Sequence, residues 1–72
     1  MQFKLNINIS YDDFLPYYQG VSESVLTNDI HGRQLQIHAK YFKPFLTPVG
    51  IKGQFILELD EEGKYKSLIK LE

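Results

Sequence analysis

The 72-residue sequence contains no cysteine and no tryptophan, and only one methionine and three prolines. The lack of cysteine excludes disulfides, cysteine-rich metal sites and thiol chemistry. A chain of this length forms one domain, residues 1–72, which buries only about 60% of its unfolded surface. Small domains without disulfides or metals depend on an efficient core or on a partner chain. The ten aromatic residues, five Phe and five Tyr, fit an aromatic core and do not exclude self-association.

The sequence also lacks a long apolar run. A membrane-spanning helix needs about 20 consecutive apolar residues, and the apolar stretches here are far shorter. The N-terminus enters a strand-like pattern directly, without the basic and then apolar regions of a signal peptide. We therefore expect a cytoplasmic protein that does not contact a membrane.

Acidic residues are missing from the middle of the chain. Between Ile30 and Leu57 there are four basic residues and no acid, whereas the remainder carries all nine acids and four lysines. The formal net charge is −1, so no strong general attraction to nucleic acid or to a membrane surface is expected. The basic segment 30–57 predicts at most a local site for an anionic ligand.

Apolar and polar residues alternate clearly in segments 2–9, 33–39 and 54–60, which is typical of strands with one buried and one solvated face. Weaker alternation at 21–27 and 65–71 predicts two further strands. Glycine-containing turns at 28–32 and 61–64 predict hairpins between strands two and three and between strands four and five.

One short helix is expected between the first two strands. Ser10 fits an N-cap, Asp13 fits a capping box, and Gly20 fits a C-terminal stop. Pro16 should kink or shorten this helix, leaving about two turns. A second, shorter helical turn that starts near Pro44 is expected within 40–46. The predicted fold is α+β and mostly β, either a five-stranded antiparallel bent sheet or a small, partly open barrel, in the order β-α-β-β-β-β.

The expected core is drawn from the apolar positions of these segments. It comprises Phe3, Leu5, Ile7, Ile9, Phe14, Leu15, Tyr18, Val25, Leu35, Ile37, Phe42, Phe45, Phe55, Leu57, Leu59 and Leu68.

No catalytic, metal or cofactor site is predicted, and enzymatic activity is not expected. A zinc site needs three or four ligands and a catalytic pair needs a defined geometry, so His31 and His38 are expected to be solvated. The pair Asp12-Asp13 fits helix capping. The acidic segment 60–62 fits a solvated hairpin tip, since calcium loops draw their ligands from about 12 residues.

The segment 40–45 interleaves lysines with aromatic residues, a composition suited to stacking nucleobases while lysines contact phosphates. The candidate contacts to nucleic acid or another ligand are Arg33, Lys40, Tyr41, Lys43 and Lys52. This hypothesis requires these side chains to converge on one face of the fold.

The predicted function is a non-catalytic interaction module that binds a protein partner or a second copy of itself. Tyrosine favours interfaces because its ring is apolar and its tip is polar, and an open sheet leaves edge strands available for pairing. The alternative is weak binding of single-stranded nucleic acid or an anionic ligand through the basic segment 30–57.

The chain also resembles a family of short, uncharacterised bacterial proteins of about this length. The residues that carry the resemblance are Tyr17-Tyr18-Gln19-Gly20, Gly32-Arg33, Pro44-Phe45 with Thr47, Gly50-Ile51-Lys52-Gly53-Gln54-Phe55, and Lys64 with Ser67-Leu68. They are spread over nearly the whole chain. The resemblance implies a bacterial origin and a domain of unknown function, and it brings no activity and no functional residues with it.

Overall fold

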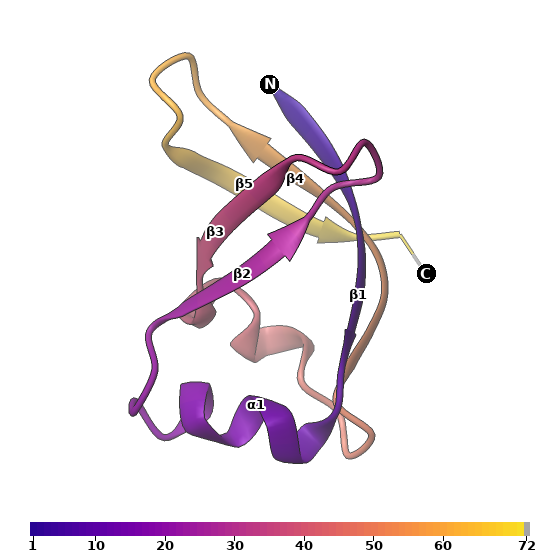
Figure 1. The fold of residues 1–72 in the computed structure, drawn as a ribbon, viewed down its shortest axis with the longest axis vertical. Helices are drawn as coiled ribbons and strands as arrows, with labels where there is room; N and C mark the ends of the chain where they lie inside the picture. The colour runs from indigo at the N-terminus through magenta and orange to yellow at the C-terminus, as the bar shows by residue number, and fades with distance from the viewer. Residues whose placement is uncertain (72) are drawn as a thin grey trace.

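The polypeptide folds into two small antiparallel sheets, with the helices gathered at one end (Figure 1). The computed structural model describes residues 1–71. Its elements are β1 (Gln2–Ile9), α1 (Tyr11–Tyr18), β2 (Ser24–Asn28), β3 (Gln34–His38), the 3-10 helices η1 (Ala39–Tyr41) and η2 (Lys43–Phe45), β4 (Ile51–Leu59) and β5 (Tyr65–Lys70). The mostly β, antiparallel fold with an α-helix after the first strand is therefore confirmed.

The prediction of one five-stranded sheet, either bent or closed into a small, partly open barrel, is wrong. Within residues 1–71, β1, β4 and β5 form one sheet in the order β1-β4-β5, and β2 and β3 form a second. Within the described residues, backbone hydrogen bonding links the two sheets where Leu5 forms an isolated bridge with Asp29 and the Ile30 N–H donates to the Lys4 carbonyl at 2.9 Å. The contact involves the end of the β2–β3 hairpin rather than its length, because the hairpin crosses the larger sheet instead of continuing it (Figure 1).

The second strand is shorter than the expected segment 21–27. The N–H groups of Val21 and Ser22 both donate to the Pro16 carbonyl, at 2.9 and 3.1 Å. These residues therefore close the C-terminal end of α1 and are unavailable for a strand ladder. As a result β2 begins only at Ser24, and Val21 is exposed.

Helix α1 forms as expected, with eight residues and Pro16 inside. The Ser10 hydroxyl accepts a hydrogen bond from the Asp13 N–H at 3.1 Å, which confirms Ser10 as the N-cap. Phe14 is fully buried and Tyr17 packs against it at a ring-centroid distance of 5.5 Å. Tyr18, which the sequence placed in the core, is instead 55% exposed.

The core lies between the two sheets and above α1. Among the described residues, twelve buried apolar side chains form one cluster: Phe3, Leu5, Ile7, Phe14, Val25, Ile37, Ala39, Phe42, Ile51, Phe55, Leu57 and Leu68. Ten of them were expected, and Ala39 and Ile51 were not. Ile51 is fully buried because β4 starts three residues earlier than the alternation suggested and pairs with the end of β1.

Candidate functional site

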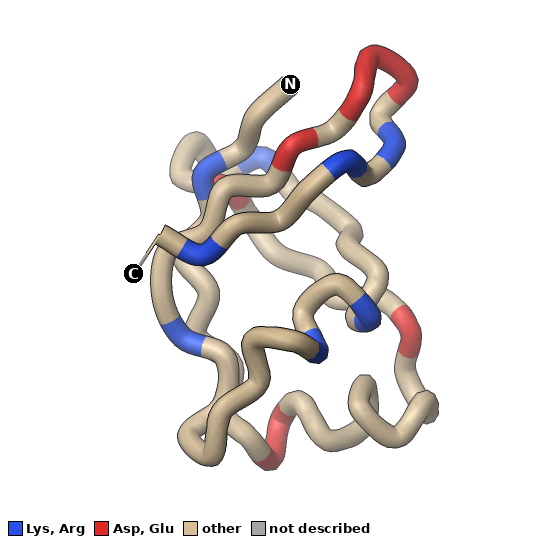
Figure 2. Tube along the Cα trace, turned by 180° about the vertical axis from the view of Figure 1, so that it is seen from behind, with Lys and Arg blue, Asp and Glu red and all other residues tan. Residues whose placement is uncertain are grey.

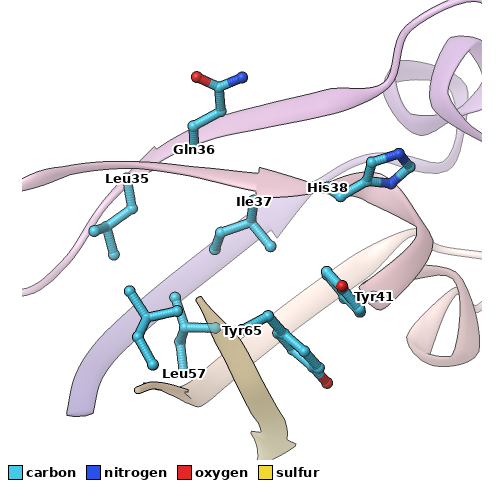
Figure 3. A pocket seen from close by; sticks show the side chains of 8 residues that line it. Leu35, Gln36, Ile37, His38, Tyr41, Leu57 and Tyr65 are labelled. Carbon is cyan, nitrogen blue, oxygen red and sulfur yellow. The ribbon is translucent and has the colours of Figure 1, made fainter. Parts of the chain in front are cut away.

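An apolar pocket opens between the two sheets, and we call it the inter-sheet pocket. It has a volume of about 90 Å³. Its lining comes from β3, η1, β4 and β5 and consists of Leu35, Gln36, Ile37, His38, Tyr41, Leu57, Leu59 and Tyr65. In Figure 3 the Leu35 and Ile37 side chains point down from β3 toward Leu57, whereas the Gln36 side chain points away. Gln36 therefore borders the pocket with its backbone.

Two tyrosines close one end of the inter-sheet pocket. The Tyr41 and Tyr65 rings are stacked almost parallel, with centroids 3.6 Å apart and an interplanar angle of 7° (Figure 3). Tyr41 comes from η1, directly after β3, and Tyr65 opens β5. The stacked rings thus connect the C-terminal end of β3 to the three-stranded sheet. Tyr41 is the one member of the sequence-predicted ligand residues that lines this pocket.

The position of Tyr41 is set by the turn that precedes it. The His38 Nδ1 atom accepts a hydrogen bond from the Lys40 N–H at 3.1 Å, so the imidazole acts as the N-cap of η1. The His38 ring also meets the Tyr41 ring edge-on at 6.3 Å. His38 is exposed, as expected, but its Nδ1 atom has a structural partner.

Two candidate lysines each lie beside an aromatic ring, and one of these rings, Tyr41, lines the pocket. The Lys40 ammonium is 5.1 Å from the centroid of the Tyr41 ring. The Lys43 ammonium is 5.7 Å from the centroid of the Tyr18 ring on α1. Both distances are within the range of cation–π interactions. Tyr18, an expected core residue, thus has an exposed ring that contacts the Lys43 ammonium.

Arg33 and Lys52 lie elsewhere. Arg33 precedes β3 and Lys40 lies beyond its other end, so the five residues of this strand alone place roughly 17 Å of extended chain between them. Lys52 is exposed and alternates with the buried Ile51 on β4, so it faces away from the side that carries Leu57 and Leu59. Figure 2 likewise shows Lys and Arg positions distributed along the trace, while acidic positions gather at the turn between β4 and β5. The five candidate residues do not form one continuous patch.

Arg33 is held by a buried carboxylate. Asp29 is 5% exposed; its Oδ1 atom accepts from the N–H groups of His31 at 2.9 Å and Arg33 at 2.8 Å. Its Oδ2 atom accepts from Arg33 Nε at 2.6 Å, and the guanidinium lies 4.7 Å from the centroid of the Phe3 ring. Arg33 therefore locks the β2–β3 turn to β1.

Burial disfavours the charged form of Asp29, but the hydrogen bonds from Arg33 and His31 and the charge of Arg33 outweigh it, so the pKa of Asp29 lies below its usual value. The ionised carboxylate thus stabilises the folded state. This stabilisation is complete above the ordinary pKa of 3.8 and is lost as the pH falls through the lowered folded-state pKa.

We expect Asp29→Asn to unfold at a lower urea concentration than the parent protein at pH 7, because the amide cannot accept the Arg33 Nε–H as a carboxylate does. The difference between the two urea midpoints should shrink as the pH falls below about 4, because the carboxylate of the unfolded parent chain binds a proton there before that of the folded chain does. Urea unfolding at a series of pH values measures this. A difference that stays constant down to about pH 2 would contradict the assigned role.

Within the described part of the chain, no three His, Asp or Glu side chains are grouped closely enough to hold a metal ion. None of the helices in residues 1–71 has the length and apolar character needed to cross a membrane.

Neither the curated proteins nor the solved structures contain a significant match to this chain. The model of a family described as a protein of unknown function, DUF2835, matches residues 1–71. Because the match covers almost the full length, the chain belongs to the DUF2835 family.

Proposed function

We propose that this chain is a non-catalytic interaction module that binds an extended polypeptide segment at the inter-sheet pocket. One observation carries the proposal: an apolar pocket is bordered by a strand, β3, that has a neighbour on only one side within residues 1–71. An unpaired edge offers backbone hydrogen bonds, and an adjacent pocket offers a place for a side chain. This combination is the basis of recognition by strand addition.

The chemistry of the pocket lining supports binding rather than catalysis. The lining residues are four aliphatic residues, two tyrosines, one histidine and one glutamine, the last bordering the pocket with its backbone, and they include no carboxylate and no lysine. The histidine caps η1 through its Nδ1 atom. The buried carboxylate of Asp29 is occupied by the β2–β3 turn, outside this pocket.

A second candidate function is weak binding of single-stranded nucleic acid or an anionic ligand. The observation that favours it is the pairing of Lys40 with Tyr41 and of Lys43 with Tyr18, near neighbouring ends of η1, η2 and α1. Aromatic faces with adjacent cations can stack bases and hold phosphates. Arg33 and Lys52 do not extend this surface, so we rank it second.

An amide chemical-shift titration of the isotope-labelled protein distinguishes the two functions. One arm uses a pool of random short peptides and the other uses a pool of short single-stranded oligonucleotides, each at low and at raised salt. The proposal expects peptide-induced shifts at β3 and at Leu57, Leu59 and Tyr65 that survive raised salt. Salt-sensitive shifts at Lys40, Tyr41 and Lys43 with the oligonucleotides alone would favour the second candidate. No shift in either arm would overturn both.

We also propose a cytoplasmic location and a bacterial origin, which the cysteine-free sequence and the resemblance noted above support. Fractionation of cells that express the chain from its own gene would test the location.

A further inference from the structure

We infer that the polypeptide bound by β3 is the β3 strand of a second copy of this chain. The two strands would pair antiparallel and symmetrically about Gln36, to give a continuous four-stranded sheet in the order β2-β3-β3-β2. This inference rests on the proposed function and names its partner.

The backbone of β3 is arranged for such a pairing. At the two ends of the β2–β3 ladder, the Asp29 N–H donates to the Arg33 carbonyl and the Ala39 N–H donates to the Glu23 carbonyl. Hydrogen-bonded pairs alternate along an antiparallel ladder, so Leu35 and Ile37 bond to β2. The backbone groups of the intervening residues Gln34, Gln36 and His38 therefore point to the free edge.

This edge lacks the features that normally prevent edge-to-edge pairing. Its sequence, Gln-Leu-Gln-Ile-His, contains no proline and no Lys, Arg, Asp or Glu. By contrast, β5 carries Lys66 and Lys70, and its ladder with β4 has an irregularity at Glu58/Leu59. The far edge of β2 is joined at its end to β1 by the Leu5–Asp29 bridge. The β3 edge is thus the least protected of these three.

The strand is also complementary to itself. Pairing about Gln36 places Gln36 opposite Gln36 of the second copy, and Gln34 opposite His38 of the second copy, all on the solvated face. Leu35 then lies opposite Ile37 of the second copy on the buried face. No like charges meet in this register, and the two-fold symmetry closes the assembly at two chains.

The inter-sheet pocket gives the second copy a place to insert. Leu35 of the second copy would lie beside Ile37, on the face that looks toward Leu57 and Leu59. The pocket volume of about 90 Å³ is well below the roughly 150 Å³ of a cavity that accepts benzene, so it suits an aliphatic side chain. By symmetry, Leu35 of the first copy fills the second pocket.

The expected dimer is weak. Two five-residue strands and one leucine from each copy fall at the low end of interface sizes, below about 1,200 Å² of total buried surface. The mass of the parent protein should therefore rise with concentration from 8.4 kDa toward twice that value, and sedimentation between about 10 μM and about 1 mM covers the range for a weak complex.

Because the parent chain has no cysteine, a single introduced thiol reports the register. In the proposed pairing the two Gln36 Cα atoms are about 5.5 Å apart, within the roughly 4.4–6.8 Å that a disulfide requires. The variant Gln36→Cys should therefore form a covalent dimer on mild oxidation. The matched control is Gln34→Cys, on the same strand and the same exposed face, where the two thiols would be offset by four residues, about 13 Å.

We expect Gln36→Cys to cross-link about tenfold faster than Gln34→Cys, because the pairing raises the effective concentration of only the first thiol pair. Circular dichroism of both reduced variants verifies that they fold. Equal rates, no cross-linking at about 1 mM, or a parent protein that stays at 8.4 kDa would overturn the inference. A monomer that still shows peptide-induced shifts at β3 would overturn this inference alone and leave the proposed function standing.

Discussion

Replacing Gly50 with alanine is expected to leave most of the protein molecules unfolded at 25 °C. Gly50 has a φ of +107° and directly precedes Ile51, whose partner is the last residue of β1. A Cβ atom at this position would overlap the Ile9 carbonyl oxygen and lie 2.7 Å from the carbonyl carbon of Ser10. These are backbone atoms at the junction of β1 and α1, so they cannot move aside as the tip of a flexible side chain can.

The cost of Gly50→Ala should exceed about 4 kcal/mol, which is close to the whole stability of many small domains. Gly63→Ala is a matched control, because Gly63 has a φ of +83° but nothing within 4 Å of an added Cβ. That variant should lose only about 1–2 kcal/mol, the cost of the left-handed conformation itself. Far-UV circular dichroism and urea unfolding measure both. Equal losses in the two variants would mean that the close approach at Gly50 is not rigid.

The strand pattern was predictable because one face of each long strand is buried. Phe3, Leu5 and Ile7 alternate with exposed neighbours in β1, as the sequence indicated. The N-cap at Ser10 was predictable for a similar reason, since its hydrogen bond spans only three residues. Interactions that are local in sequence leave a readable pattern.

The division into two sheets was not predictable, because it depends on contacts between distant segments. The alternation at 21–27 includes Val21 and Ser22, whose N–H groups instead bond to the Pro16 carbonyl at the end of helix α1. The local sequence does not show that the helix end competes with a strand for these two N–H groups. The choice of Tyr17 over Tyr18 for packing likewise depends on where α1 lies relative to the core.

The candidate site was predicted only at Tyr41. The inter-sheet pocket brings Leu35 together with Leu57 and Tyr65, which are far apart in the sequence. The sequence pattern predicted that Leu35 and Leu57 are core residues, but it did not predict a pocket between them. The contact between Arg33 and Asp29 does have a local signal in the sequence. An Asp and an Arg four residues apart in a hairpin turn can bond to each other, as Asp29 and Arg33 do.

Replacing Phe55 with alanine is expected to cost about 3–5 kcal/mol of unfolding free energy. Phe55 is fully buried on the central strand β4, and it lies opposite Leu5 in the ladder with β1. Its ring meets the rings of Phe42 at 6.1 Å and Phe45 at 5.1 Å, both edge-on. The substitution therefore removes two aromatic contacts and leaves a cavity at the point where β4 packs against the two 3-10 helices.

Two further variants test whether the loss comes from the cavity. Phe55→Leu keeps most of the volume and should cost less than about 1.5 kcal/mol. Phe45→Ala removes a half-buried ring with one of the two contacts, so its cost should fall between those of the Phe55 variants. Equilibrium urea unfolding gives all three values. A loss below about 1 kcal/mol for Phe55→Ala would mean that Phe42 and Phe45 collapse into the space, and that the aromatic cluster is not what fixes β4 against η1 and η2.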